Sequence, residues 1–107
     1  MIKETPNLNY IEQLSGDDMS FQNKLIAVIK REFPEEKALY LNNIKSNNFI
    51  KASENVHKLK HKISILGLEK SYEVAANFED KLLENSAEGK AEFEIILKII
   101  TNFLATL

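Results

Sequence analysis

The sequence predicts an all-α fold, an antiparallel four-helix bundle of up-down-up-down topology with a short additional helix at the amino terminus. Three observations lead to this prediction. The 107 residues hold only three glycines and two prolines, too few turn-forming residues for a many-stranded fold. Apolar residues recur at spacings of three and four along long segments, and short polar stretches separate these segments. We therefore expect a single domain over residues 1–107.

Two helices are expected in the first half of the chain. A short one is predicted over Asn7 to Leu14, and Ser15-Gly16-Asp17-Asp18 is typical of a helix stop followed by an N-cap. The second helix begins near Asp18 and runs to Lys45. Its apolar positions are Phe21, Leu25, Val28, Ile29, Ala38, Leu41 and Ile44. Pro34 lies inside it and removes one backbone hydrogen bond, so we expect either a kink or a break there.

Three further helices are predicted in the second half. Ser46-Asn47-Asn48 is a polar corner that caps the third helix, which ends near Gly67. The fourth runs from about Glu69 to Glu84, and the last from about Lys90 to the end of the sequence. The positions expected to face the core are Phe49, Val56, Leu59, Ile63, Leu66, Tyr72, Ala75, Phe78, Leu82, Phe93, Ile96, Leu97, Ile100, Leu104 and Leu107.

Charge and composition narrow the functional classes. With 14 Lys and Arg against 16 Asp and Glu, the net charge of −2 provides no general field for a polyanion, so no nucleic-acid partner is expected. The sequence has no cysteine, which excludes disulfides, thiolate catalysis and cysteine-bound zinc. Met1 to Pro6 contain no apolar run typical of a signal peptide, and the stretch from Phe93 to Leu107 is too short and too polar to span a membrane. We expect a cytoplasmic protein without membrane insertion.

Both histidines lie in the third predicted helix, four residues apart. If Val56, Leu59 and Ile63 point inward, a rotation of about 100° per residue places an adjoining strip on the more exposed side. This strip consists of His57, Lys60, His61 and Ser64. A neutral imidazole is a good nucleophile toward phosphorus, and a lysine one turn away can neutralise phosphoryl oxygens. The strip is therefore the candidate site, and Lys58 and Lys62 add local positive charge.

Other interpretations of this strip stay open at the level of sequence. Exposed lysines and histidines on a helix often form only a solvated surface. An i,i+4 histidine pair can also bind zinc, with Glu54 as a further ligand, although no spacing announces the remaining ligands. A basic amphipathic helix could bind a membrane surface, but the apolar stripe of this helix is needed to close the core.

The segment from Val56 to Leu68, VHKLKHKISILGL, resembles the signature of histidine-containing phosphotransfer (HPt) domains. His57 matches the phospho-accepting histidine of this signature, Leu59 its apolar position and Lys60 its lysine. Leu66-Gly67 matches the leucine-glycine pair that closes the signature. Ala75-Ala76-Asn77-Phe78-Glu79 is similar to the family's next helix, and Phe33-Pro34-Glu35-Glu36 to a stretch before its histidine helix. The resemblance covers about Asp18 to Glu84. One position departs from it, because His61 stands where the family usually has glycine.

The resemblance implies a phospho-carrier rather than an autonomous kinase. His57 would accept a phosphoryl group from the phospho-aspartate of a receiver domain, Lys60 would stabilise it, and a second receiver would take it up. The implied partners are response-regulator receiver domains and a hybrid sensor histidine kinase, with His61, Ser64 and Lys58 facing them. No cofactor of its own is implied, since the receiver supplies Mg²⁺. We expect a monomer. The alternative is a docking module that binds receivers without phosphotransfer.

Overall fold

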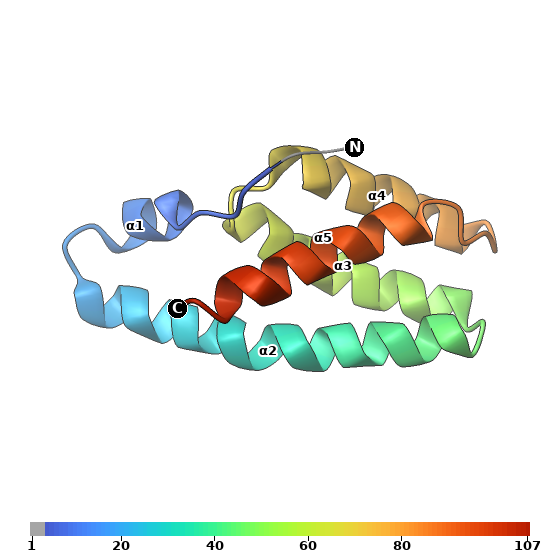
Figure 1. Cartoon of the computed structure of the whole chain (residues 1–107), viewed down its shortest axis with the longest axis horizontal. Helices are drawn as coiled ribbons and strands as arrows, with labels where there is room; N and C mark the ends of the chain where they lie inside the picture. The colour runs from blue at the N-terminus through green and yellow to red at the C-terminus, as the bar shows by residue number, and fades with distance from the viewer. Residues whose placement is uncertain (1–3) are drawn as a thin grey trace.

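The computed structural model describes residues 4–107, and every regular element in this part of the chain is an α-helix. Figure 1 shows the elements in chain order. They are α1 (Asn9–Ser15), α2 (Met19–Lys45), α3 (Phe49–Ile65), α4 (Glu69–Leu83) and α5 (Lys90–Leu104). The prediction of an all-α chain is confirmed, and the predicted helices all occur within a few residues of their expected ends.

Helix α2 passes through Pro34 without a break. The proline removes one hydrogen bond of the helix, which costs about 3 kcal/mol in a helix interior. Its ring is exposed, whereas Phe33 and Tyr40 on either side of it are buried in the core. Packing of these two aromatic side chains holds α2 helical on both sides of Pro34, so the break considered from the sequence does not occur. The uninterrupted helix of 27 residues sets the 45 Å long axis of the molecule.

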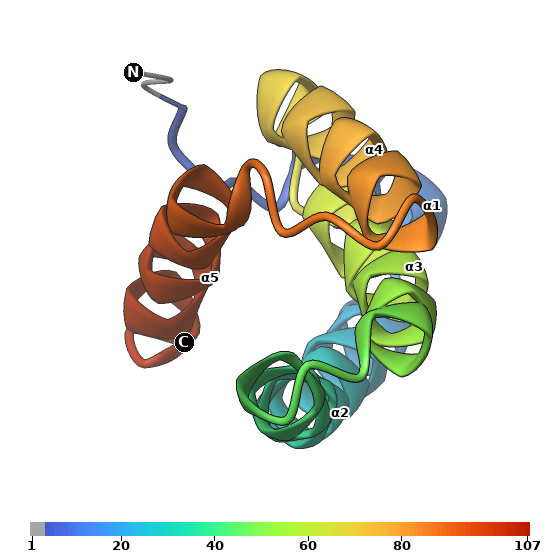
Figure 2. The same cartoon turned by 90° about the vertical axis from the view of Figure 1, so that its right-hand side faces the viewer.

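The helices pack as antiparallel neighbours. Seen nearly end-on in Figure 2, α2, α3 and α4 follow one another around an arc, and α5 lies on the opposite side. Contacts are most extensive between α3 and α4 and between α2 and α3. Helix α5 packs mainly on α4 and only sparsely on α2. Helix α3 therefore sits in the middle of the arc, with its outer side free of any helix.

Three aromatic rings join α2, α4 and α5 in the core. The ring of Tyr40 lies edge-on to those of Phe78 and Phe93, with centroids 6.1 and 5.1 Å away. Edge-to-face pairs of this kind add about 0.5–1.5 kcal/mol each beyond the area they bury. The Tyr40 hydroxyl donates a hydrogen bond of 3.0 Å to Glu94. Burial, together with the nearby Glu94 carboxylate, raises the pKa of Tyr40.

A segment before α1 crosses the corner between α3 and α4. The backbone N–H of Asn7 donates to the carbonyl of Leu66 at 2.9 Å. Gly67 has φ +78°, and a Cβ there would lie 2.6 Å from the side-chain nitrogen Nδ2 of Asn7, so only glycine fits at this corner. Glu4 accepts hydrogen bonds from the backbone N–H groups of Lys70 and Ser71. Partial burial acts to raise the pKa of Glu4, but these hydrogen bonds outweigh it and lower the pKa.

Some details of the helix ends and apolar faces differ from the sequence-based expectation. Asp18 caps α2 as predicted, accepting from the Phe21 N–H at 3.0 Å. At the next corner, however, the Asn48 side chain makes no cap hydrogen bond, and Asn47 ends α2 in the left-handed conformation, φ +59°. Tyr72 and Leu107 were expected to face the core but are exposed, and so are three of the apolar positions of α2, Phe21, Ala38 and Leu41, because the helices do not enclose those sides.

Within residues 4–107, no helix has the length and apolar character that crossing a membrane requires. The expectation that the chain carries no amino-terminal signal peptide rests partly on residues 1–3, which lie outside the described part of the chain.

Candidate functional site

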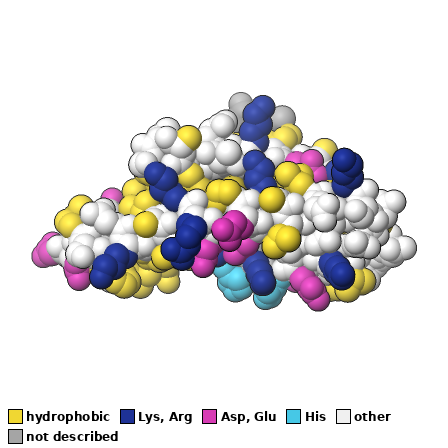
Figure 3. Space-filling view, turned by 90° about the horizontal axis from the view of Figure 1, so that it is seen from below, with side chains coloured by type: hydrophobic (Ala, Val, Ile, Leu, Met, Phe, Trp, Pro, Cys, Tyr) yellow, Lys and Arg dark blue, Asp and Glu magenta, His cyan; other side chains and the backbone are white. Residues whose placement is uncertain are grey.

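His57 lies on the outer ridge of α3, where neither neighbouring helix covers it. Val56 and Leu59 are fully buried, and this orientation of the helix leaves the His57 side chain 55% exposed. Figure 3, viewed from below, shows both histidines at one edge of the molecule beside acidic and basic side chains. The sequence-based prediction that His57 faces solvent on a rigid helix agrees with this arrangement.

One ring nitrogen of His57 is held by a carboxylate from α4. Nδ1 lies 3.1 Å from Oε2 of Glu79. An ionised carboxylate can only accept, so Nδ1 must carry a proton to form this hydrogen bond. In the neutral ring the lone pair then resides on Nε2. Glu79 thus selects the tautomer in which Nε2 is the nucleophilic atom.

Lys60 is less exposed than the helical spacing suggests. Its side chain is only 14% exposed, and Nζ lies 2.9 Å from Oε1 of Glu79 and 5.4 Å from the centre of the Tyr72 ring. The contact with Glu79 raises the pKa of Lys60 against the opposing effect of burial. Oε1 of Glu79 is buried and has no well-aligned hydrogen-bond donor, so the contact with Lys60 is an ion pair in character. Lys60 is charged and adjacent to His57, but its charge is shared with Glu79.

Glu79 therefore links the two predicted site residues, each through one carboxylate oxygen. Sequence reasoning placed Glu79 in the next helix of the resembling family but did not assign it to the site. The available signal was its position directly after the buried Phe78, on a helix expected to pack beside the histidine helix. Periodicity within one helix cannot specify which residue of a neighbouring helix meets a given side chain.

His61 borders the imidazole of His57. The two ring centroids are 5.1 Å apart and the ring planes are almost perpendicular, at 89°. Both rings are exposed, so a protein that approaches Nε2 of His57 also meets His61. A glycine at this position would leave that side of the ring open.

Ser64 and Lys58 are exposed on either side of this arrangement. Ser64 continues the row of His57 and His61 by one further turn, at a spacing of seven residues from His57. Lys58 lies beside an open groove of about 470 Å³ between α3 and α4, which His57, Glu79 and Leu83 also line. The structure thus exposes His57, Lys58, His61 and Ser64 on the outer part of α3, whereas Lys60 turns inward toward α4.

Lys62 points away from the site. Its ammonium group lies 2.9 Å from Glu32 and 3.1 Å from Glu36, both on α2. Burial acts to lower the pKa of Lys62, but these two carboxylates outweigh it and raise the pKa. The expectation that Lys62 adds positive charge around His57 is therefore wrong, because α2 takes up this charge.

The metal-site interpretation finds no set of ligands in the described part of the chain. Over residues 4–107, no three histidine, aspartate or glutamate side chains converge as metal ligands would. Nδ1 of His57 is occupied by Glu79, and Glu54 lines the open groove instead of completing a ligand set with His61.

The arrangement is suited to nucleophilic attack by the His57 imidazole. It offers a solvent-accessible imidazole with a fixed tautomer, a carboxylate that can stabilise positive charge on the ring, and an ammonium group three residues along the same helix.

Comparisons of the chain with protein-family models, with curated proteins and with solved structures found no match.

Proposed function

We propose that this protein is a histidine phosphotransfer protein, which accepts a phosphoryl group on His57 from a receiver-domain phospho-aspartate and passes it to another receiver. The observation that carries the proposal is the contact between Nδ1 of the exposed His57 and Glu79. This contact holds the imidazole through Nδ1 and leaves Nε2 free to act as the nucleophile. The resemblance of VHKLKHKISILGL to the HPt signature supplies the class of reaction.

In the proposed step, Nε2 attacks the phosphorus of the receiver's phospho-aspartate in line. The bond from phosphorus to the aspartate oxygen breaks as the bond to Nε2 forms, and its electron pair remains on the aspartate carboxylate. Nδ1 keeps its proton throughout, so the ring gains positive charge. The Glu79 carboxylate, 3.1 Å away, stabilises that charge in a position fixed before the reaction.

Lys60 is the second group in the proposed mechanism. It lies three residues after His57, one helical turn along α3. Its side chain pairs with Glu79 in the free protein. As the ring becomes positively charged, Glu79 interacts more strongly with it and less strongly with Lys60, so Lys60 can neutralise the phosphoryl oxygens. The protein requires no cofactor for this step, and the receiver provides Mg²⁺.

The surface around His57 supports docking of a second protein. Ile50, two turns before His57 on the same side of α3, is exposed, and so is Leu83 on α4 beside the groove next to His57. Leu39 of α2 is exposed between Glu36 and Asn43, which both contact α3. Apolar side chains scattered around a polar centre suit an interface that must form and separate repeatedly. We propose that receivers, including that of a hybrid sensor kinase, dock here and contact His61, Ser64 and Lys58.

The proposal also covers the helix topology, the oligomeric state and the cellular compartment of the protein. Helices α2 to α5 would form an up-down-up-down bundle with α1 covering one end, which agrees with their antiparallel packing. The protein would act as a cytoplasmic monomer, since one exposed ridge suffices for the reaction and the second set of reacting groups belongs to the receiver. It would carry phosphoryl groups without making or hydrolysing a phosphoryl donor.

Incubation with a phosphorylated receiver tests the proposal. The expected result is an acid-labile, base-stable phosphate on the protein that disappears in His57→Gln. His61→Gln is the matched control, because it removes the neighbouring imidazole and leaves the Glu79 contact in place; it should still be labelled. Undiminished labelling of His57→Gln would contradict the assigned acceptor. Receiver binding without any label would favour the alternative, a docking module that has lost phosphotransfer, for which His61 at the usual glycine position is the supporting observation.

A further inference from the structure

A groove lies between α2 and α5, away from the His57 site on α3. The two helices enclose an open groove of about 440 Å³. Its apolar lining comes from Phe33, Pro34, Ala38, Leu41, Leu104 and Ala105. This volume falls in the range of small-molecule sites, about 300–1,000 Å³. Its residues do not overlap with those around His57.

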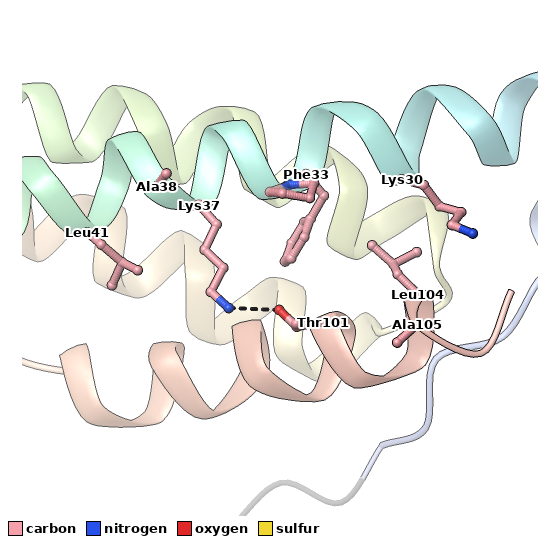
Figure 4. A pocket seen from close by; sticks show the side chains of 9 residues that line it. Lys30, Phe33, Lys37, Ala38, Leu41, Thr101, Leu104 and Ala105 are labelled. Atoms are coloured by element: carbon pink, nitrogen blue, oxygen red, sulfur yellow. Dashed lines mark hydrogen bonds between the residues drawn. The ribbon is translucent and has the colours of Figure 1, made fainter.

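Lysine side chains of α2 cross the groove at two points, as Figure 4 shows for Lys37. Lys37 donates a 2.9 Å hydrogen bond to the Thr101 hydroxyl, and Lys30 donates to the main-chain oxygen of Leu107. The two lysines are seven residues apart, so the open stretch between them is about 10 Å long. A docked helix would have to break both crossings, whereas a small molecule fits between them.

The charged side chains that line the groove are both lysines, Lys30 and Lys37. Lys37 forms no ion pair with any carboxylate in residues 4–107. Lys98 on α5 is also exposed and unpaired in this part of the chain, and lies on the same side of its helix as Ala105. Glu94 is on this side of α5 too and accepts from the Tyr40 hydroxyl, but it does not line the groove. No acidic side chain lines the groove.

We propose that the groove between α2 and α5 binds a small anionic amphiphile, a carboxylate on an apolar chain. The carboxylate would accept from Lys37, and the chain would cover Pro34, Leu104 and Ala105 in the direction of Lys30. Lys37 now bonds to a neutral hydroxyl, and a charged acceptor makes a hydrogen bond roughly twice as strong. Thr101 need not move, because its hydroxyl already donates to the carbonyl of Leu97.

Decanoate, used below its micelle concentration, tests the proposal by chemical-shift titration of the full ¹⁵N-labelled chain. We expect saturable shifts at the amides of Phe33, Ala38 and Leu104, and at least about tenfold weaker binding of decanol and of decyltrimethylammonium. Lys37→Gln should weaken decanoate binding about tenfold, and Ala38→Phe, an exposed position that lines the groove, should abolish it.

Two variants serve as matched controls. Lys24→Gln removes an exposed lysine of α2 outside the groove, and Ala91→Phe adds the same ring at an exposed alanine of α5 that does not line it. Both should bind decanoate as the unchanged protein does. His57→Gln should also bind it unchanged, so failure of this proposal and failure of the proposed phosphotransfer are separate results.

Three outcomes would overturn the inference. Absence of saturable shifts would remove the site. Equal affinity for decanoate and decanol, with no effect of Lys37→Gln, would remove the role of charge. Sedimentation with phosphatidylglycerol vesicles but no binding of monomeric decanoate would assign the groove to a membrane surface instead.

Discussion

Two lysines on opposite flanks of α3 show how differently the same residue type is used. Lys60 faces α4 and Lys62 faces α2, and each is largely buried, with 14% and 13% of its side chain exposed. Each pairs with glutamate at 2.9 Å, and in each case this raises the lysine pKa. Burial and pairing alone therefore do not distinguish a structural lysine from a functional one.

The two lysines differ in whether another side chain also contacts their glutamate partner. Lys62 has two carboxylates, Glu32 and Glu36, and within residues 4–107 neither of them pairs with a histidine. Lys60 shares its single carboxylate with an exposed imidazole. An ion pair whose acid also bonds to a nucleophile changes when that nucleophile reacts. The α2 flank thus fastens two helices together, and the α4 flank couples a lysine to His57.

Replacing Lys60 gives the largest expected difference between the flanks. Lys60→Ala should slow phosphoryl transfer about ten- to a hundredfold, because a charge-assisted hydrogen bond to the phosphoryl group is lost. Helical content measured by circular dichroism should stay the same. Lys51→Ala, which removes an exposed lysine of α3 outside the proposed docking surface and without an ion pair in the described structure, is the control and should transfer at nearly the normal rate. An unchanged rate in Lys60→Ala would remove its proposed role.

Replacing Lys62 should give a smaller effect of a different kind. Lys62→Met removes the cation that pairs with Oε2 of Glu36. The other carboxylate oxygen of Glu36, Oε1, is buried and already has no hydrogen-bond donor. We expect a loss of about 1–3 kcal/mol in the free energy of unfolding, limited by the partial exposure of Glu32. Urea denaturation measures it. The transfer rate per folded molecule should not change; a slowed rate at full folding would show that the α2 flank also takes part in the reaction.

Periodicity predicted the parts of the fold that a single helix determines. Val56, Leu59 and Ile63 were expected to point inward, they are fully buried, and His57 is exposed as a consequence. Contacts between helices were not predictable in this way. The position of Glu79 against His57 depends on how α4 packs on α3, which no pattern within either helix encodes.

Residues near Pro34 show the same limit for backbone structure. The local rule predicted either a kink or a break, since it treats only the lost hydrogen bond and the restricted Phe33. Of these two outcomes, the break does not occur. The burial of Phe33 and Tyr40 against other helices outweighs that local cost. The exposure of Lys60 was overestimated for a related reason, since its long side chain reaches across to Glu79 and Tyr72 on α4.

The central claim is that Glu79 fixes the proton on Nδ1 and leaves Nε2 of His57 to accept phosphorus. Nitrogen-15 NMR of the imidazole groups, before and after reaction with a phosphorylated receiver, tests it most directly. The account predicts the Nδ1–H tautomer at His57 in the unmodified protein, a phosphoryl group on Nε2 after transfer, and loss of the tautomer preference in Glu79→Ala. A phosphoryl group on Nδ1 of His57, or on His61, would contradict it.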